Sequence, residues 1–186
     1  ENIGAILDAI RHEQNYLCGQ TVSAVVVDDG SGDETQERVR RSASGIALEL
    51  LVNDRNRGLA YTFRRGMTHA INSSADEDVI VCMDADNSHL VGQVHAMVSQ
   101  IRQGRDVVVA SRYQYGSVIR GVPFVRQWLS RAMGLLFRMV YPISLVRDYS
   151  CGFRAYRAAF LKELLARHGA SMFSREGFAC MVALLI

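Results

Sequence analysis

Short apolar runs alternate with stretches of helical periodicity along the first 110 residues. Four runs of four or five mostly apolar residues have the length of buried strands: 24–27, 48–52, 79–83 and 107–110. Between them, apolar residues recur at helical spacing in three longer stretches: 34–41, 59–71 and 90–101. Strands that are apolar throughout are typical of parallel sheets buried on both faces. The alternation therefore predicts an α/β domain with three layers, in which helices cover a mostly parallel sheet.

The two ends of the chain interrupt this pattern. A helical pattern begins at once, with Ile3, Ile6, Leu7 and Ile10, and no apolar strand precedes it. Residues 183–186 end the chain within another apolar pattern. We therefore expect residues 1–186 to be one domain that is truncated at both ends and lacks its first strand.

Length, charge and cysteine content limit the class of protein and the partners that this chain can have. The chain has 186 residues, which is enough for a single domain with a sizeable core. Its formal net charge is +2, so no strong electrostatic field favours nucleic acid as a partner. The four cysteines are far apart in the sequence, which is typical of reduced thiols in the cytoplasm. No apolar run is long enough to cross a bilayer.

Carboxylate pairs follow two of the predicted strands. Asp28 and Asp29 come directly after the first strand, and Asp84 and Asp86 come directly after the third. The carboxyl ends of parallel strands meet at one edge of a sheet, which is where ligands bind. Two carboxylates one residue apart repel each other, and a hard divalent cation relieves that repulsion. We therefore expect Mg²⁺ or Mn²⁺ at Asp84 and Asp86, with open positions for diphosphate oxygens.

The same edge lacks the usual phosphate-binding loops. Neither a G-x-G-x-x-G sequence nor a Walker lysine loop occurs in the chain. Such loops hold phosphates on backbone N–H groups in dinucleotide-binding domains and P-loop proteins. A metal-bridged diphosphate is then the remaining way for this edge to hold a nucleotide.

Five short segments carry a resemblance to a known family. In chain order they are 25–35 (Val-Val-Val-Asp-Asp-Gly-Ser-Gly-Asp-Glu-Thr), 56–60 (Asn-Arg-Gly-Leu-Ala), 84–89 (Asp-Ala-Asp-Asn-Ser-His), 111–113 (Ser-Arg-Tyr) and 148–154 (Asp-Tyr-Ser-Cys-Gly-Phe-Arg). Together they resemble the motifs of glycosyltransferase family 2. The last two segments resemble one branch of it, the dolichol-phosphate mannosyltransferases and related polyprenyl-phosphate glycosyltransferases.

The resemblance implies a GT-A fold and inverting transfer of a sugar. The donor would be a GDP- or UDP-linked sugar, and the acceptor a polyprenyl or dolichyl phosphate. On this pattern Asp29, together with Asp28, contacts the base or the ribose, and Gly58 belongs to a nucleotide-binding segment. Asp84 and Ala85 lie beside the diphosphate. The family also opens with a strand that this sequence does not contain.

The resemblance assigns further roles around the metal and the acceptor. Asp86 is the direct metal ligand, and Ser88 stands where some relatives place a glutamine ligand. Arg112 and Arg126 match positions that face the acceptor phosphate. Arg154 follows a glycine–phenylalanine pair near the acceptor or the diphosphate.

The identity of the acceptor decides whether a base is needed. A phosphate monoester is already anionic near neutral pH, so metal neutralisation and in-line positioning suffice. A sugar hydroxyl would need a base, and Asp148 is the best candidate. Asp148 has two ordinary alternatives, as a helix cap or as the partner of Arg147 or Arg154 in an ion pair. We expect His89 to support the metal turn rather than to act as the base.

Two other functions fit part of the pattern. A strand followed by D-x-D also opens phosphohydrolases of the haloacid dehalogenase type, in which Asp84 would be the nucleophile. That reading leaves the turn at Asp28 and Asp29 without a task. A regulatory paralogue without activity is the non-enzymatic alternative, and the presence of both acidic turns favours an enzyme.

The segment 124–141 has the pattern of an amphipathic helix at a membrane surface. At about 100° per residue, Arg126, Arg131 and Arg138 share one arc, while Trp128 and aliphatic residues fill the opposite side. A broad apolar face, a tryptophan and positive charges are typical of helices that bind anionic lipids at the interface. We therefore expect a cytoplasmic protein associated with the cytosolic face of a membrane.

Overall fold

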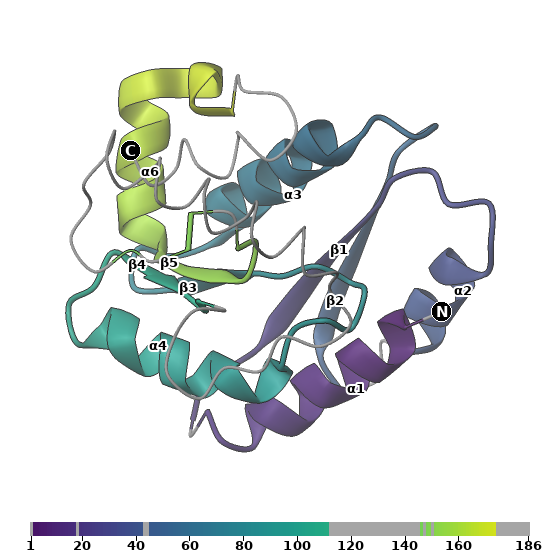
Figure 1. The fold of residues 1–186 in the computed structure, drawn as a ribbon, viewed down its shortest axis with the longest axis horizontal. Helices are drawn as coiled ribbons and strands as arrows, with labels where there is room; N and C mark the ends of the chain where they lie inside the picture. Colours follow the sequence, from purple (N-terminus) through teal and green to yellow (C-terminus); the bar gives the residue numbers. More distant parts are fainter. Residues whose placement is uncertain are drawn as a thin grey trace, which may run out of the picture.

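The computed structural model describes residues 2–17, 19–42, 45–111, 146, 148–149 and 151–173. These residues form helices and strands that alternate along the chain (Figure 1). In order, the elements are α1 (Ile3–Gln14), β1 (Ser23–Asp28), α2 (Thr35–Arg41), β2 (Ala47–Val52), α3 (Leu59–Ser73), β3 (Val79–Cys82), the 3₁₀ helix η1 (Val91–Gln93), α4 (Val94–Arg102), β4 (Val107–Val109), β5 (Arg154–Arg157), α6 (Ala158–His168) and the 3₁₀ helix η2 (Gly169–Phe173). The four predicted strands and the three helical stretches predicted between them, 34–41, 59–71 and 90–101, are confirmed.

Strands β1 and β2 form a parallel pair. Val26 is opposite Leu50 in the register, and Asp28 at the end of β1 is opposite Val52. Both strands therefore end at the same edge. The sequence predicts such a shared edge for β1 and β3, which belong to separate sheets among the described residues, so that expectation stays a prediction. The segments that follow them, 29–34 and 53–58, leave the sheet together at this edge.

The other three strands form a second sheet with the order β3-β5-β4. Strand β5 is antiparallel to both of its neighbours. The α/β class is confirmed, but fewer neighbouring strands are parallel than predicted. Among the described residues, β1 and β2 are the only directly paired parallel strands. The cause is β5, whose Arg-Ala-Tyr-Arg sequence has no apolar run and was not recognisable as a strand. Ala155 and Tyr156 at its centre are nonetheless fully buried.

Helices cover both sheets in layers (Figure 1). Helices α3 and α6 lie on one side of the strands, and α1 and α4 lie on the other. Helix α3 joins the two sheets: Phe63 packs in one core with Ile80 of β3 and Tyr156 of β5, while Gly66 lies against β1. A Cβ atom on Gly66 would come within 2.9 Å of the Cγ2 atom of Val27, so glycine permits this close approach. The loops that precede α3 are thereby mounted on a packed scaffold.

Within the described part of the chain, no helix combines the length and the hydropathy needed to cross a bilayer. The segment 124–141, predicted to lie on a membrane surface, is outside the described residues, and so are Arg112, Arg126 and Arg147.

Candidate functional site

Asp28 closes the turn between β1 and α2 from the inside. Its side chain is 3% exposed. Oδ1 accepts the backbone N–H of Ser31 at 3.1 Å, and Oδ2 accepts the side-chain amide of Gln36 at 2.8 Å. Both carboxylate oxygens thus bind the protein itself. Asp28 shapes the turn that carries Asp29, and its predicted contact with a nucleotide stays a prediction.

Gly30 lets this turn pack directly against the loop that follows β2. Its φ angle is +74°, in the left-handed region that favours glycine. A Cβ atom there would lie 2.6 Å from the carbonyl carbon of Arg55 and 2.9 Å from the nitrogen of Asn56. The first acidic turn and the 53–58 loop are therefore in backbone contact.

Asp29 bonds the two loops together. Oδ1 accepts the side-chain amide of Asn53 at 2.7 Å and the N–H of Arg57 at 2.8 Å, and Oδ2 accepts the N–H of Gly58 at 2.8 Å. Partial burial alone would raise the pKa of this carboxyl. The hydrogen bonds from Arg57, Asn53 and Gly58 outweigh burial and hold the pKa of Asp29 below its ordinary value. Asp29 is therefore an anion at neutral pH.

Gly58 occupies the junction between this loop and α3. Its φ of +83° turns the chain into the helix, and its carbonyl accepts the N–H of Thr62 in the first turn. The sequence placed Gly58 and Asp29 in separate nucleotide-binding motifs, and the structure brings them together. One bonded set of backbone and carboxylate groups results, at the edge where β1 and β2 end.

Two polar residues of this site had no motif to reveal them. Asn53 is 3% exposed, and its amide reaches both Asp29 and the hydroxyl of Thr62. Arg65, from the second turn of α3, donates to the carbonyl of Val52 at 2.6 Å and to Oδ1 of Asn53 at 2.5 Å. The only sequence signal was their position, directly after a strand and near a helix start.

The D-A-D turn follows β3 and is supported by His89. The ring Nδ1 of His89 accepts the N–H of Asp84 at 3.3 Å, and its Nε2 lies 3.8 Å from Oδ2 of Asp84. The same ring stacks on Phe153, with centroids 5.0 Å apart and planes 13° apart. The expected supporting role of His89 agrees with these contacts. The carboxylate of Asp84 stays 40% exposed.

Asp86 stands at the exposed tip of this turn. Its Oδ1 accepts the N–H of Ser88 at 2.9 Å, and Asn87 between them has a φ of +63°. Hydrogen bonding from the Ser88 side chain and backbone, against a smaller effect of burial, lowers the pKa of Asp86. Asn2, just ahead of α1, donates to the backbone carbonyl of Asp86 at 3.2 Å, a contact that the sequence did not suggest. Ala85 is exposed beside them.

The donor set of the D-A-D turn fits a hard divalent cation that keeps other ligands. Asp84 and Asp86 both present carboxylate oxygens, whereas Ser88 is engaged with Asp86. Within the described residues, no group of three or more His, Cys, Asp or Glu side chains is placed to hold a metal. Mg²⁺ is commonly bound by only one or two carboxylates together with water and phosphate oxygens.

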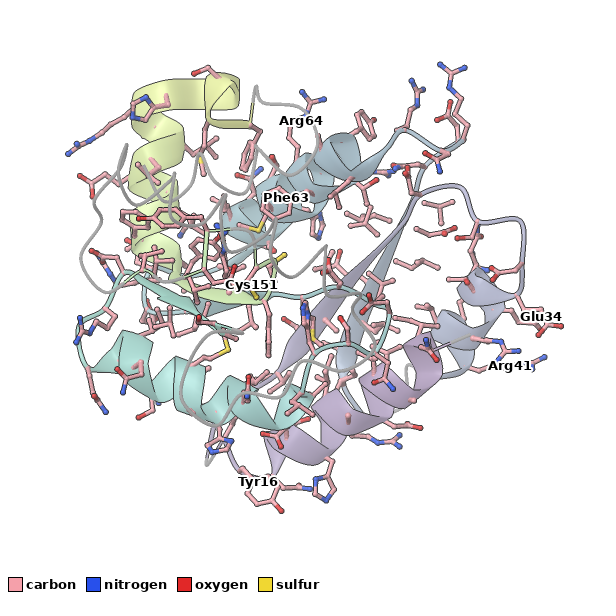
Figure 2. The ribbon with its side chains drawn as sticks, viewed as in Figure 1. Tyr16, Glu34, Arg41, Phe63, Arg64 and Cys151 are labelled. Carbon is pink, nitrogen blue, oxygen red and sulfur yellow. The ribbon has the colours of Figure 1, made fainter. Side chains whose placement is uncertain are left out.

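The later motif lies in the interior. Asp148 and Arg154 are each 1% exposed. Oδ1 of Asp148 accepts the N–H of Cys151 at 3.1 Å, and Arg154 donates to the carbonyls of Tyr149 and Cys151, both at 2.7 Å. Figure 2 shows Cys151 in the middle of the molecule, between the helix layers. These side chains hold the turn that leads into β5, and their predicted roles in catalysis and binding stay predictions.

Comparison with known proteins identifies the family of this domain. Residues 1–165 match the family model described as glycosyl transferase family 2. The chain belongs to this family. The two acidic turns are thus those of a glycosyltransferase, and the strand-plus-D-x-D pattern is not that of a phosphohydrolase.

Several family members of known description are similar to the chain. It is 30% identical to a dolichol-phosphate mannosyltransferase of Pyrococcus furiosus over 84% of this chain and 43% of the relative. It is also 30% identical to a polyprenol monophosphomannose synthase of Mycolicibacterium smegmatis, over 88% and 60%. An undecaprenyl-phosphate 4-deoxy-4-formamido-L-arabinose transferase of Pseudomonas aeruginosa is 28% identical over 83% and 43%. The chain spans about half the length of these relatives.

Proposed function

We propose that this domain transfers a sugar from a nucleoside diphosphate sugar to a polyprenyl phosphate. Family membership supports glycosyl transfer. Two of the three relatives are named for mannose and the third for 4-deoxy-4-formamido-L-arabinose, and all three names include a polyprenol or dolichol carrier with phosphate. The acceptor class is therefore the common element, and the sugar is the part that varies. The proposed donor carries guanine or uracil as its base.

The observation that carries the donor side is the bonding of Asp29 to the 53–58 loop. A carboxylate held by Asn53, Arg57 and Gly58 is fixed in place and ionised. Its unused lone pairs can accept from the donor groups of a base or a ribose. Rigid placement reduces the ordering that ligand binding would otherwise require.

The diphosphate is assigned to the D-A-D turn. Asp86 would hold Mg²⁺ or Mn²⁺ directly, Asp84 would support it, and Ser88 keeps the Asp86 carboxylate oriented through its hydrogen bonds. When bound, such a cation neutralises the charge that develops on the leaving diphosphate. The stacking of His89 on Phe153 fixes the turn against the core.

The burial of Asp148 favours a phosphate acceptor over a sugar hydroxyl. A general base must reach the proton that it removes, to within about 3 Å or through one water. Asp148 is 1% exposed and already accepts the N–H of Cys151. A phosphate oxygen attacks as an anion and needs no such base. We assign Arg112 and Arg126 to the acceptor phosphate because arginine binds phosphate bidentately.

A membrane surface is the natural partner of an enzyme whose acceptor is a lipid. We assign the contact to the 124–141 segment, on its pattern of arginines opposite Trp128 and aliphatic residues. The protein would then work in the cytoplasm, at the cytosolic face of a membrane. A sugar-hydroxyl acceptor and an inactive regulatory paralogue are the alternatives that the experiments below separate from this proposal.

Nucleotide binding gives the first test of the function. Calorimetry of GDP and UDP with the protein should show tight binding of one of them that depends on Mg²⁺ or Mn²⁺. Binding of neither nucleotide, with or without metal, would support the inactive paralogue. Release of phosphate from a generic aryl phosphate would indicate phosphohydrolase activity and contradict the proposal.

A further inference from the structure

A partly buried chain of polar side chains runs from α3 to the loop-binding carboxylate of Asp29. Arg65 donates to Oδ1 of Asn53 at 2.5 Å, and Nδ2 of Asn53 donates to Oδ1 of Asp29 at 2.7 Å. The hydroxyl of Thr62, one turn earlier on α3, lies 3.2 Å from the same Nδ2. Three charged or polar groups are therefore linked in series, and the central one is 3% exposed.

The chemistry of the two ends fixes which way the Asn53 amide points. A guanidinium has only donors, and an ionised carboxylate has only acceptors. The amide oxygen must then face Arg65, and the amide NH₂ must face Asp29. Turning the amide over would set NH₂ against a cation and oxygen against an anion.

Arg65 itself is held in place at the base of the chain. Besides Asn53, it donates to the backbone carbonyl of Val52 at 2.6 Å, at the last residue of β2. The N–H of Asn53 also donates to the carbonyl of Asp28 at 2.8 Å. The amide is therefore anchored to the strand ends on one side and clamped by the helix on the other.

We propose that Arg65 is a positioning residue for donor binding, which acts through the Asn53 amide to set the orientation of Asp29. Arg65 does not touch the carboxylate that it orients. This proposal rests on the proposed function, since it assumes that Asp29 meets the nucleotide. It assigns to the start of α3 a task in substrate binding beyond its place in the core.

The neighbouring arginine provides a matched control. Arg64 extends away from the body of the molecule (Figure 2), and its guanidinium lies 5.4 Å from the ring centroid of Tyr61. It carries the same charge and lies on the same helix, but its contact is with Tyr61 and not with Asn53 or Asp29. Arg64→Met and Arg65→Met therefore remove the same groups, but only the second breaks the polar chain.

Steady-state kinetics with separate variation of donor and acceptor is the main readout. Arg65→Met should raise the donor KM about tenfold and leave the acceptor KM and kcat nearly unchanged. A tenfold change is the size expected when about one hydrogen bond that orients Asp29 is lost. Arg65→Lys should recover part of the effect, because an ammonium can still donate to Asn53. Asn53→Asp should reproduce the defect, because it keeps the acceptor for Arg65 but replaces the donor to Asp29 with a like charge. Arg64→Met should match the wild type.

Hydrogen exchange at Arg57 and Gly58 tests the same chain without any substrate. Their N–H groups donate to Asp29, so Arg65→Met should speed their exchange, and Arg64→Met should not. If Arg65→Met only lowers the melting temperature, with an unchanged donor KM in a protein that still turns over, the proposal is overturned while the proposed function stands. If the wild type binds neither GDP nor UDP, the proposed function fails as well, whatever the exchange rates show.

Discussion

The carboxylate of Asp29 lies 2.8 Å from the backbone nitrogen of Gly58. These residues are 29 positions apart and come from different motifs. Their contact joins the turn after β1 to the loop before α3, at the edge where the two parallel strands end. A nucleotide that touches either loop would therefore meet a surface built from both.

Replacing Asp29 with asparagine should destabilise the fold in a manner that depends on pH. The pKa of Asp29 is lowered in the folded state, so the stability from its ionised form is complete above the ordinary value of 3.8. It is lost as the pH falls through the lower folded value. Urea unfolding should show Asp29→Asn less stable by about 1–2 kcal/mol at about pH 7, with a smaller difference near about pH 3.

The pH dependence distinguishes the contribution of the Asp29 charge to stability from the contribution of its shape. A difference between the two proteins that stays constant down to about pH 3 would mean that ionisation of Asp29 contributes nothing to the loops. In the active protein, the same substitution should raise the donor KM more than the acceptor KM. An effect confined to the acceptor would place this turn on the wrong side of the site.

Asp86→Asn should abolish metal-stimulated nucleotide binding and leave the fold intact. The residue is exposed at the tip of its turn, so its charge matters to a ligand far more than to the core. Titration of Mn²⁺ and nucleotide by calorimetry, alongside a thermal melt, measures both effects. Gln93→Ala, on η1, offers a control outside the D-A-D turn. Metal stimulation that survives in Asp86→Asn would refute the assignment of the ligand.

Gly30→Ala should destabilise the protein by about 2–4 kcal/mol. The added Cβ atom would meet the Arg55 backbone at 2.6 Å, and alanine is strained at a φ of +74°. Gly32→Ala in the same segment is the control, because nothing lies within 4 Å of its Cβ position. Its effect should stay within about 0.5 kcal/mol. Equal unfolding midpoints in urea for the two variants would contradict the close packing of the two loops.

The 124–141 segment should bind anionic vesicles. In liposome flotation, the wild type should float with anionic vesicles, where each arginine near the surface adds about 1 kcal/mol. Trp128→Ser/Leu136→Ser and Arg131→Glu/Arg138→Glu should both weaken flotation, the first through lost apolar contact and the second through lost charge. A wild type that stays at the bottom, or two variants that both float as well as the wild type, would make this segment part of the core.

The sequence predicted those strands and helices that a local pattern of apolar residues marks. Apolar runs revealed β1 to β4, because a strand buried on both faces needs apolar side chains along its length. Strand β5 escaped because Arg154 at its start is buried with its donors on backbone carbonyls, and because its partners come from distant parts of the chain. Burial of an arginine by such contacts cannot be inferred from residue type.

In the candidate site, too, local sequence features could be predicted and tertiary contacts could not. Its acidic turns stood out because carboxylates directly follow apolar strands. Asp28 and Asp29 could not be told apart, although one closes its own turn and the other binds a second loop. Asn53 and Arg65 were missed because their roles depend on tertiary contacts between the end of β2 and the side of α3.

Direct detection of the product tests whether this protein transfers a sugar to a polyprenyl phosphate. The full-length protein would be incubated with a panel of radiolabelled GDP- and UDP-sugars, polyprenyl phosphate in vesicles, and Mg²⁺ or Mn²⁺. We expect one donor to give a labelled polyprenyl-phosphate sugar, chelation of the metal to stop its formation, and Asp86→Asn not to make it. Label transferred only to acceptors with a sugar hydroxyl, or no transfer from any donor by a protein that is folded and bound to metal, would contradict this function.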